Sequence, residues 1–510
     1  MQNSELQIYN SLTRQKERFE AINPPFVGLY VCGPTVYSDV HLGNCRTFIS
    51  FDVIYRYLMY LGYKVRYVRN ITDVGHLEND VDIGGEDKVA KKARLEQKEP
   101  MEIVQHYTNG FHEIMAKLNT LRPSIEPSAT GHIVEQIEMV KDILENGYAY
   151  EKAGSVYFDT LKFAKDKEGA YGKLSGKKLD DLLSETRDDL KNQGEKNHPS
   201  DFAIWVKAAP EHIMRWPSPW SDGFPGWHLE CSVMSTKYLG NFFDIHGGGL
   251  DLQFPHHENE IAQNYGACGC QPAKYWLHGN MLEMNGKKMS KSIDPETGLS
   301  NSISPYELFS GNSPLISKAY SPMVIRFFML QTHYRSTLNL TNDALLAADK
   351  GYARLMEGNR TLQAMIHDGN ESLTDENQQI NSLLDQANAD MNDDFNTPKA
   401  LSRLFVLVNK INSIANGKIP ISVIASTTLE RMKKVFNDFI FEIFGLQDET
   451  QFAANGDDVT LDKLMELIID IRQESRAKKD WGTADKIRDV LNDAKIQLKD
   501  GKDGTTWSKN

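Results

Sequence analysis

A short apolar run between two pairs of chain-bending residues constrains the fold more than any other feature of this sequence. The run, Phe26 to Cys32, follows Pro24-Pro25 and precedes Gly33-Pro34, which is the pattern of a buried strand. We expect a helix from about His41 to Leu61 and a second strand from Tyr63 to Asn70. Strand, helix and strand in this spacing predict a βαβ unit, and therefore a parallel sheet covered by helices.

The length of the chain requires several domains, because 510 residues are too many for one hydrophobic core. Apolar residues at helical spacing from Ile133 to Leu144, closed by Gly147, predict a helix, and residues 160–200 have the composition of a solvated insertion. Past about residue 340 the pattern is helical, with start signals at Thr341 and Thr397-Pro398. We predict an α/β fold in which a parallel-sheet domain with an insertion is followed by a helical bundle and a small C-terminal unit.

The composition is that of a soluble globular protein, with 40% hydrophobic and 25% charged residues. The segment Met1 to Ser11 lacks the basic and apolar pattern of a signal peptide. The apolar stretch Phe48 to Tyr63 contains Asp52 and Arg56, so it predicts an amphipathic helix and no membrane span. Five cysteines are too few, and odd in number, for a disulfide framework. We expect a cytoplasmic protein.

The net charge of −13 argues against a general nucleic-acid binder, but recognition depends on where positive charge is concentrated. Residues 471–510 carry ten Lys or Arg against seven Asp or Glu, so the C-terminal segment is locally basic. Such a segment on an acidic enzyme is compatible with RNA contact.

The junction between the first strand and the first helix has the features of an anion site. Free backbone N–H groups and the positive end of the helix dipole meet there. His41 and Asn44 add donors three residues apart, on one side of the first turn. An ordinary loop capped by a histidine would explain the same residues, since His-x-Gly-Asn alone is a weak motif.

The string Lys288-Met289-Ser290-Lys291-Ser292 is a more specific candidate. We expect a flexible loop whose lysines move onto a triphosphate as negative charge develops. A lysine run is usually a solvated loop. The ordered string nevertheless favours a function, and the more so together with His41.

Four scattered residues could form a metal site: Cys32 after the first strand, Cys231, and the pair His256 and Glu260. The last two are four apart on a predicted helical segment, so their side chains leave the same face. Such ligands suit zinc. His257 is an equally good ligand by spacing, and buried cysteines beside a locally bonded histidine would need no metal.

Three further cysteines lie outside this set. Cys268-Gly269-Cys270 has no matching pair elsewhere in the chain, so we interpret it as structural or incidental. Cys45 is expected to pack against the sheet.

Together these residues resemble the cysteinyl-tRNA synthetases, which are class I aminoacyl-tRNA synthetases. Residues His41 to Asn44 are similar to the family's first signature, normally His-Ile-Gly-His, and Lys288 to Ser292 match its second signature in full. The other matching segments are 30–37, 69–73, 226–231, 243–249, 251–260, 480–488 and 504–507. The likeness runs nearly from end to end, and its motifs are very specific.

The resemblance implies a Rossmann-like parallel-sheet catalytic domain with an insertion, followed by an α-helical bundle and a small C-terminal tRNA-binding domain. The implied boundaries are 1–125 and 223–285 for the two catalytic halves, 126–222 for the connective insertion, 286–340 for the KMSKS loop and stem-contact region, 341–450 for the helical tRNA-binding domain, and 451–510 for the anticodon-binding domain. For contacts with unpaired anticodon bases the candidates are Trp481, Trp507, Arg472 and Arg476.

The resemblance also implies the chemistry: ATP-dependent activation of L-cysteine and its transfer to tRNA(Cys), by a protein that we expect to be a monomer. One zinc ion per chain would be held by Cys32, Cys231, His256 and Glu260. Cysteine would be lined by Thr35, Thr72, Trp227 and His246. ATP, bound with Mg²⁺, would contact His41, Asn44, Gly248, Gly249, Asp251, Lys288, Ser290 and Lys291, of which His41, Asn44, Lys288 and Lys291 would be catalytic.

Two features depart from the family pattern. Asn44 stands where the family has a second histidine, which keeps a donor but removes a titratable group. The segments 77–87 and 295–318 are longer than the family needs, and we assign neither a function.

Two rival functions share part of this pattern. A cysteine ligase acting on an amino-sugar acceptor would use the same zinc and both signatures, but not the helical and basic C-terminal sequence. A zinc-stabilised RNA-binding protein without catalysis would not need the lysine string.

Overall fold

The computed structural model describes residues 5–75, 87–167, 169–177, 196–210, 212–293, 300–367, 374–449, 464–465, 467–476, 478, 480–493, 496–501 and 504–509. The chain separates into two compact units, Met1–Leu446 and Gln447–Asn510.

A four-stranded parallel sheet in the order β10-β9-β3-β4 forms the centre of the first unit. Strands β3 (Phe26–Val31) and β4 (Lys64–Arg69) are joined by helix α1 (Leu42–Tyr60), which confirms the predicted βαβ unit. Strands β9 (Phe243–Gly249) and β10 (Ala273–Gly279) arrive after a long insertion and complete the sheet.

Alternation of side chains along the strands explains how both faces of this sheet are buried. Leu29 of β3 and Ile245 of β9 pack in the core with α1. Tyr30, next to Leu29, faces the other way, into a core shared with helices α7 (Trp227–Leu239) and α8 (His256–Cys268), and the ring of His246, next to Ile245, is centred 5.1 Å from the Tyr30 ring. The sheet therefore separates α1 from α7 and α8, and the chain segments that follow β3, β9 and β10 meet at its carboxyl edge.

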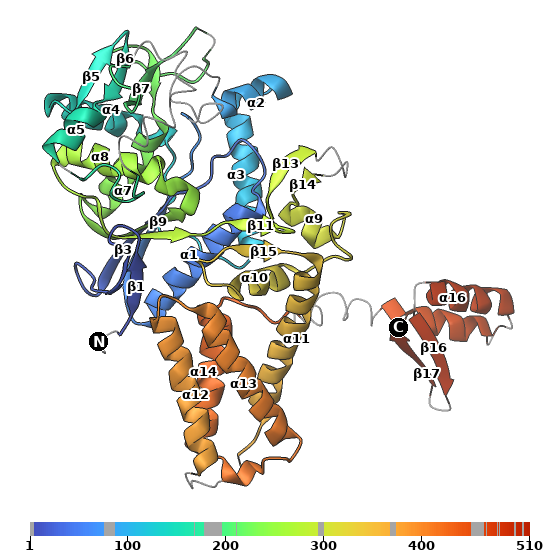
Figure 1. Ribbon diagram of the computed structural model, residues 1–510. Coiled ribbons are helices and arrows are strands. Elements are labelled where there is room, and N and C mark those ends of the chain that lie inside the picture. The colour runs from blue at the N-terminus through green and yellow to red at the C-terminus, as the bar shows by residue number, and fades with distance from the viewer. Residues whose placement is uncertain are drawn as a thin grey trace. The chain divides into compact units, whose positions relative to one another are not determined.

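The insertion between β4 and α7 contains a second sheet (Figure 1), whose core also includes Leu229 and Val233 of α7, while α2 (Lys88–Glu96) and α3 (Pro100–Lys117) of the insertion pack in the core of the parallel sheet. Its antiparallel sheet has the order β5-β6-β7-β8 and packs with aromatic residues such as Trp205 and Phe158. The other elements of the insertion are η2 (Thr130–His132), α4 (Ile133–Glu145), β5 (Ala149–Lys152), β6 (Ser155–Phe158), α5 (Thr160–Asp166), β7 (Phe202–Lys207) and β8 (Gly223–Pro225). The predicted helix ending near Gly147 is α4, and Gly147 has a φ of +75°. Of the expected solvated segment 160–200, residue 168 and residues 178–195 lie outside the described residues, as do residues 77–86. In its described part Phe163 and Leu174 are fully buried, so this part was wrongly expected to be solvated.

The lysine string was wrongly expected to be a loop, because Lys288 ends a β-hairpin and Ser290 begins a further strand. Strand β11 (Leu282–Met284) pairs with β12 (Lys287–Lys288), and β13 (Ser290–Ile293) pairs with β14 (Ser300–Asn301). Asn285 and Gly286 form the turn with φ values of +53° and +73°, as a two-residue hairpin turn requires. The other short elements of the first unit are β1 (Gln7–Asn10) and β2 (Gln15–Arg18), η4 (Leu250–Gln253), α9 (Pro305–Ser310), α10 (Pro322–Leu330) and β15 (Leu338–Leu340).

A helical bundle completes the first unit (Figure 1). Its helices are α11 (Asn342–Ala364), α12 (Asp375–Asn392), α13 (Thr397–Ala415), η5 (Ile421–Val423), α14 (Ser426–Asn437) and the π-helix η6 (Asp438–Ile443). Thr341 caps α11 by accepting from the N–H of Ala344, as predicted. Helix α13 begins where expected, but its cap is Asn396, because the Thr397 hydroxyl donates instead to the Leu330 carbonyl.

The second unit contains helix α16 (Trp481–Asp493) and a hairpin of β16 (Ile496–Gly501) and β17 (Gly504–Lys509). Met465, Leu491 and Ile496 form its small core, with Trp507 packed against them. In the described part of the chain, no helix is both long enough and apolar enough to cross a membrane.

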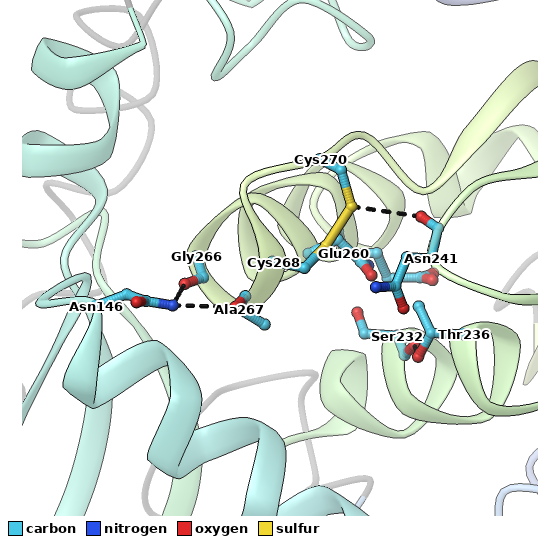
Figure 2. The surroundings of a disulfide bond; sticks show 10 residues. Asn146, Ser232, Thr236, Asn241, Glu260, Gly266, Ala267, Cys268 and Cys270 are labelled. Atoms are coloured by element: carbon cyan, nitrogen blue, oxygen red, sulfur yellow. Dashed lines mark hydrogen bonds between the residues drawn. A yellow bond between two sulfur atoms is a disulfide. The ribbon is translucent and has the colours of Figure 1, made fainter.

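Cys268 and Cys270 form a disulfide at the end of α8 (Figure 2). Asn146 fixes the same helix end by donating to the carbonyls of Gly266 and Ala267 at 2.9 and 3.0 Å. Cys45 is a free, buried cysteine of the core between α1 and the sheet, as expected. A disulfide framework is absent, but a single local bond is present, which the sequence left open.

Candidate active site and metal centre

A cleft of about 490 Å³ opens at the carboxyl edge of the parallel sheet. It is lined by the segment that follows β3 and begins α1, by Trp227 of α7, by residues after β9 and β10, and by Lys288 and Met289. This is the edge at which open parallel sheets bind ligands.

The first phosphate element, by which we mean the turn from His41 to Asn44, lies at the N-terminus of α1, on the wall of the cleft. His41 is the cap residue, and its Nδ1 accepts from the N–H of Asn44 at 3.3 Å. Both residues line the cleft. Because the remaining N–H groups of this turn and the helix dipole point the same way, the turn is suited to an anion.

The second phosphate element is the lysine string from Lys288 to Ser292. It extends from the hairpin to the same cleft. Lys288 is exposed and lines the cleft with Met289. The Asn301 side chain donates to the Lys288 carbonyl at 3.2 Å and so connects β14 to the hairpin. For Ser290 and Lys291 only the backbone, in β13, belongs to the described structure, and their roles stay predictions.

The glycine run at the end of β9 allows close approach of other groups. A Cβ on Gly249 would lie 2.3 Å from Asp251 Oδ1, and one on Gly248 would lie 2.9 Å from the His257 ring. Gly249 and Asp251 line the cleft, whereas Gly248 does not. A larger residue at either glycine would therefore displace its neighbour.

The candidate metal ligands meet beneath the cleft. Cys32, Cys231, His256 and Glu260 are all buried, and their ligand atoms lie within 4.8 Å of one another. The sulfurs of the two cysteines are 3.8 Å apart, His256 Nε2 is 3.4 Å from Cys231 Sγ, and Glu260 Oε1 is 3.3 Å from His256 Nε2 and 3.7 Å from Cys32 Sγ. His256 and Glu260 share a face of α8, as their spacing predicted.

A second set of ligand atoms also comes together here: Cys32, His246, His257 and Glu260. His257 Nε2 is 3.3 Å from Cys32 Sγ, and its other ring nitrogen is 2.9 Å from His278 Nε2. His256 and His257, between which the sequence did not choose, therefore both lie close to Cys32.

Burial dominates the electrostatics of this cluster. It raises the pKa of the Cys32 thiol well above its usual value and that of Cys231 to about 12, and the neighbouring thiol and carboxylates act on both groups. Burial also raises the pKa of Glu260, against the opposing effect of His246. A cation would reverse these shifts, because it favours the ionised form of each ligand.

The four residues expected around the amino acid divide into two pairs. Thr35 and Trp227 line the cleft, and the Trp227 ring is centred 4.6 Å from the His256 ring. Thr72 and His246 lie behind the cleft wall. The Thr72 hydroxyl donates to the Glu230 carboxylate, while His246 Nε2 is 2.8 Å from Glu260 Oε2 and its ring stacks on Trp276 at 4.4 Å.

Glu230 was missed by sequence reasoning. It is buried next to Cys231, and Asn70 and Thr72 donate to the same oxygen of its carboxylate. Burial raises its pKa well above the usual value. An acidic residue directly before a candidate ligand was the available signal.

Comparison with known proteins places the chain in one family. Residues 18–350 match the family described as tRNA synthetases class I (C) catalytic domain, and residues 386–447 match the DALR domain. The cysteine--tRNA ligase of Bacteroides fragilis is 53% identical over 506 residues, which is 99% of each chain. That of Deinococcus radiodurans is 46% identical and covers 99% of this chain and 97% of its own.

Solved structures show the same fold at low identity. A Mycobacterium tuberculosis methionyl-tRNA synthetase bound by methionyl-adenylate matches 82% of this chain and 92% of its own, with a TM-score of 0.57 and 13% identity. The expected fold class is thereby confirmed. Since near-full-length relatives at about half identity share one name, this chain belongs to the cysteine--tRNA ligase family of class I tRNA synthetases.

Proposed function

We propose that this protein attaches L-cysteine to tRNA(Cys) at the expense of ATP, releasing AMP and diphosphate. One observation carries the proposal: a buried Cys/Cys/His/Glu cluster lies beneath a cleft whose walls carry both phosphate elements. The relatives that match the full chain have the corresponding name.

We propose that the cluster holds one zinc ion. Zinc takes sulfur at about 2.3 Å and nitrogen or oxygen at about 2.0–2.2 Å, so tetrahedral ligands are about 3.8 Å apart for two sulfurs, about 3.6 Å for sulfur and nitrogen or oxygen, and about 3.4 Å for nitrogen and oxygen. The observed separations are 3.8 Å, 3.4 to 3.7 Å and 3.3 Å in that order. In the alternative set, His246 and Glu260 are only 2.8 Å apart, which is a hydrogen bond. The distances favour His256 as the ligand.

The chain's own residues account for the activation step. The cysteine carboxylate attacks the α-phosphate of ATP, and diphosphate leaves. His41, Asn44, Lys288 and Lys291 would stabilise the charge that develops on the phosphates, while Gly249 and Asp251, which line the cleft, would contact the nucleotide. Gly248 lies outside the lining of the cleft, and contacts from Gly248 and Ser290 stay predictions. The terminal ribose hydroxyl of the tRNA then attacks the cysteinyl carbonyl, and AMP leaves.

Selection of cysteine follows from the metal cluster. When bound, zinc holds a thiol as a thiolate. Thr35 and Trp227 shape the cleft beside it, and His246 and Thr72 support buried carboxylates from behind. A site that requires one polar contact rejects a substrate lacking it by about 10⁴ or more, so serine is excluded without a second hydrolytic site.

The C-terminal segments would contact the tRNA. Among the four anticodon candidates, Trp481 is 58% exposed, whereas Arg472 is buried and Trp507 packs in the small core. Arg476 is also exposed, so Trp481 and Arg476 are the two candidates placed within their unit to stack on a base.

The test is ATP–diphosphate exchange with L-cysteine or L-serine, followed by transfer to tRNA or to an amino sugar. We expect exchange with cysteine alone and transfer to tRNA alone. Exchange without tRNA charging, but with an amino-sugar product, would establish the rival ligase. Absence of exchange by folded, zinc-loaded protein would overturn the proposed activity.

A further inference from the structure

We propose that Arg326 is a positioning residue for the tRNA-dependent step, because with Arg56 and Asp52 it fixes the end of the helical bundle to helix α1. The proposal rests on the proposed function. These three residues form a buried polar node outside the lining of the cleft, and Asp52 lies one turn of α1 beyond Phe48, which lines it.

Arg326, in α10, uses its guanidinium to join three separate segments. The side chain is 0% exposed. Its Nε donates to the Phe444 carbonyl at 2.6 Å, Nη1 donates to the Leu118 carbonyl at 2.8 Å, and Nη2 is paired with the Asp52 carboxylate. The planar fork of arginine can satisfy all these acceptors at once, which a lysine cannot.

Arg56 and Asp52 extend the node along α1, where they lie four residues apart. Arg56 Nε donates to Asp52 at 2.8 Å, and its two other nitrogens donate to the carbonyls of Asn119 and Glu442. The second Asp52 oxygen accepts from the N–H of Leu121 at 2.7 Å. The carboxylate is thus paired with two guanidinium groups and a backbone donor, which is the condition for burying a charge.

The bundle contributes the carbonyls at the end of its π-helix η6. Glu442 and Phe444 accept from the two arginines, and Gly445 accepts from the Asn119 amide at 2.7 Å. Cations at helix C-termini are favourable, because they face the negative end of the dipole. Gly445 has a φ of +58°, and a Cβ there would lie 2.5 Å from Arg326 Nη2, so the node leaves no room for a side chain.

The position of the node within the first unit gives it a role beyond packing. Its contacts are on the middle of α1, whose N-terminal turn carries His41 and Asn44. The last residue of this unit, Leu446, directly follows Gly445, so the chain leaves for the second unit from the node. Figure 1 shows the far end of α1 reaching the bundle, where Tyr57 Oη donates to Asn392 at 2.9 Å.

The size of the substrates indicates which step depends on the node. Cysteine and ATP fit the cleft and need only its walls, whereas a tRNA is the one substrate large enough to touch the cleft and the C-terminal segments together. A change in the angle between α1 and the bundle would leave activation intact and misplace the acceptor end. Misplacement by about 1 Å can lower a rate on the order of 100-fold.

The experiment compares cysteine-dependent ATP–diphosphate exchange with tRNA charging in purified full-length variants. Arg326→Lys keeps the ion pair with Asp52 but loses the fork. The double variant Arg326→Met with Asp52→Asn removes both charges of that pair, and Arg56 keeps only its bonds to the carbonyls of Asn119 and Glu442. Leu404→Ala, a fully buried position in α13 away from the node, is the matched control for destabilisation. Zinc content and thermal unfolding are measured for each.

We expect both node variants to keep exchange within about threefold of wild type, and the double variant to lose on the order of 100-fold in kcat/KM for tRNA. Arg326→Lys should fall between wild type and the double variant, and Leu404→Ala should lower unfolding temperature without separating the two activities. Equal loss of both activities in Arg326→Lys, or unchanged charging by a folded double variant, would overturn the positioning role. Failure of the proposed function is distinct, because the wild type would then lack both activities.

Discussion

The hydrogen bond from His246 to Glu260 should set the affinity of the metal centre, and His246→Leu tests this. The substitution keeps an apolar volume beside Trp276 but removes the donor that lies 2.8 Å from Glu260 Oε2. That oxygen belongs to a fully buried side chain, and a buried acceptor left unpaired costs about 1–3 kcal/mol.

The expected loss of metal affinity has the same magnitude. Removing a hydrogen-bond partner of a metal ligand typically weakens metal binding by about 10- to 100-fold, or about 1.4–2.7 kcal/mol. Both routes give about 2 kcal/mol, so the zinc dissociation constant should rise by roughly 30-fold. Equilibrium competition with a chromophoric chelator at neutral pH measures this directly.

Two further variants isolate the hydrogen bond. His246→Gln keeps an N–H donor and should recover most of the affinity. His132→Leu removes another buried histidine, which bonds Tyr238 Oη at 2.7 Å outside the metal site, and should leave zinc affinity unchanged. Unaltered zinc affinity in His246→Leu, with a higher KM for cysteine, would refute the reasoning and assign His246 to the substrate.

Three other predictions concern stability, each followed by denaturant or pH titration of the full chain. Gly247→Ala should destabilise by about 1–3 kcal/mol through overpacking, since its Cβ would lie 2.1 Å from the Phe51 ring; an unchanged urea midpoint would show that the ring yields freely. Replacing Cys268 and Cys270 by serine should cost no more than about 1.6 kcal/mol, because the disulfide closes a loop of only three residues; a larger loss relative to wild type would contradict this entropic argument. Burial lowers the pKa of His278 to about 3, whereas the pKa of a histidine in the unfolded chain is about 6.5. Between these two pH values the unfolded chain therefore binds more protons than the folded chain. Stability is lost as pH falls below about 6.5, and by pH 5 the share of His278 should reach about 2 kcal/mol. His278→Gln should remove that share, and an equally steep acid profile in the variant would exclude His278 as its source.

Much of the fold was predictable because its signals are local. The apolar run at Phe26, the helix after His41 and the strand at Tyr67 each follow from periodicity and from nearby proline or glycine. The lysine string was mistaken for a loop although Asn285-Gly286 is a hairpin signal, because the charged flanks lack the apolar alternation of ordinary strands.

The features that could not be predicted depend on contacts between residues that are far apart in the sequence. Asp52 and Arg56 suggested a polar face on an amphipathic helix, yet both are buried, since Asp52 pairs with Arg56 and also with Arg326 from far along the chain. The choice between His256 and His257 likewise depends on where α7 places Cys231 and where β9 places His246. The spacing of residues along α8 determines neither of these two positions.

The most direct test of the central claim is X-ray absorption at the zinc edge of the loaded enzyme, with and without substrate. The account predicts that L-cysteine adds one sulfur to the two supplied by Cys32 and Cys231, and that L-serine adds none. An unchanged sulfur count with saturating cysteine would contradict selection of the amino acid through the metal.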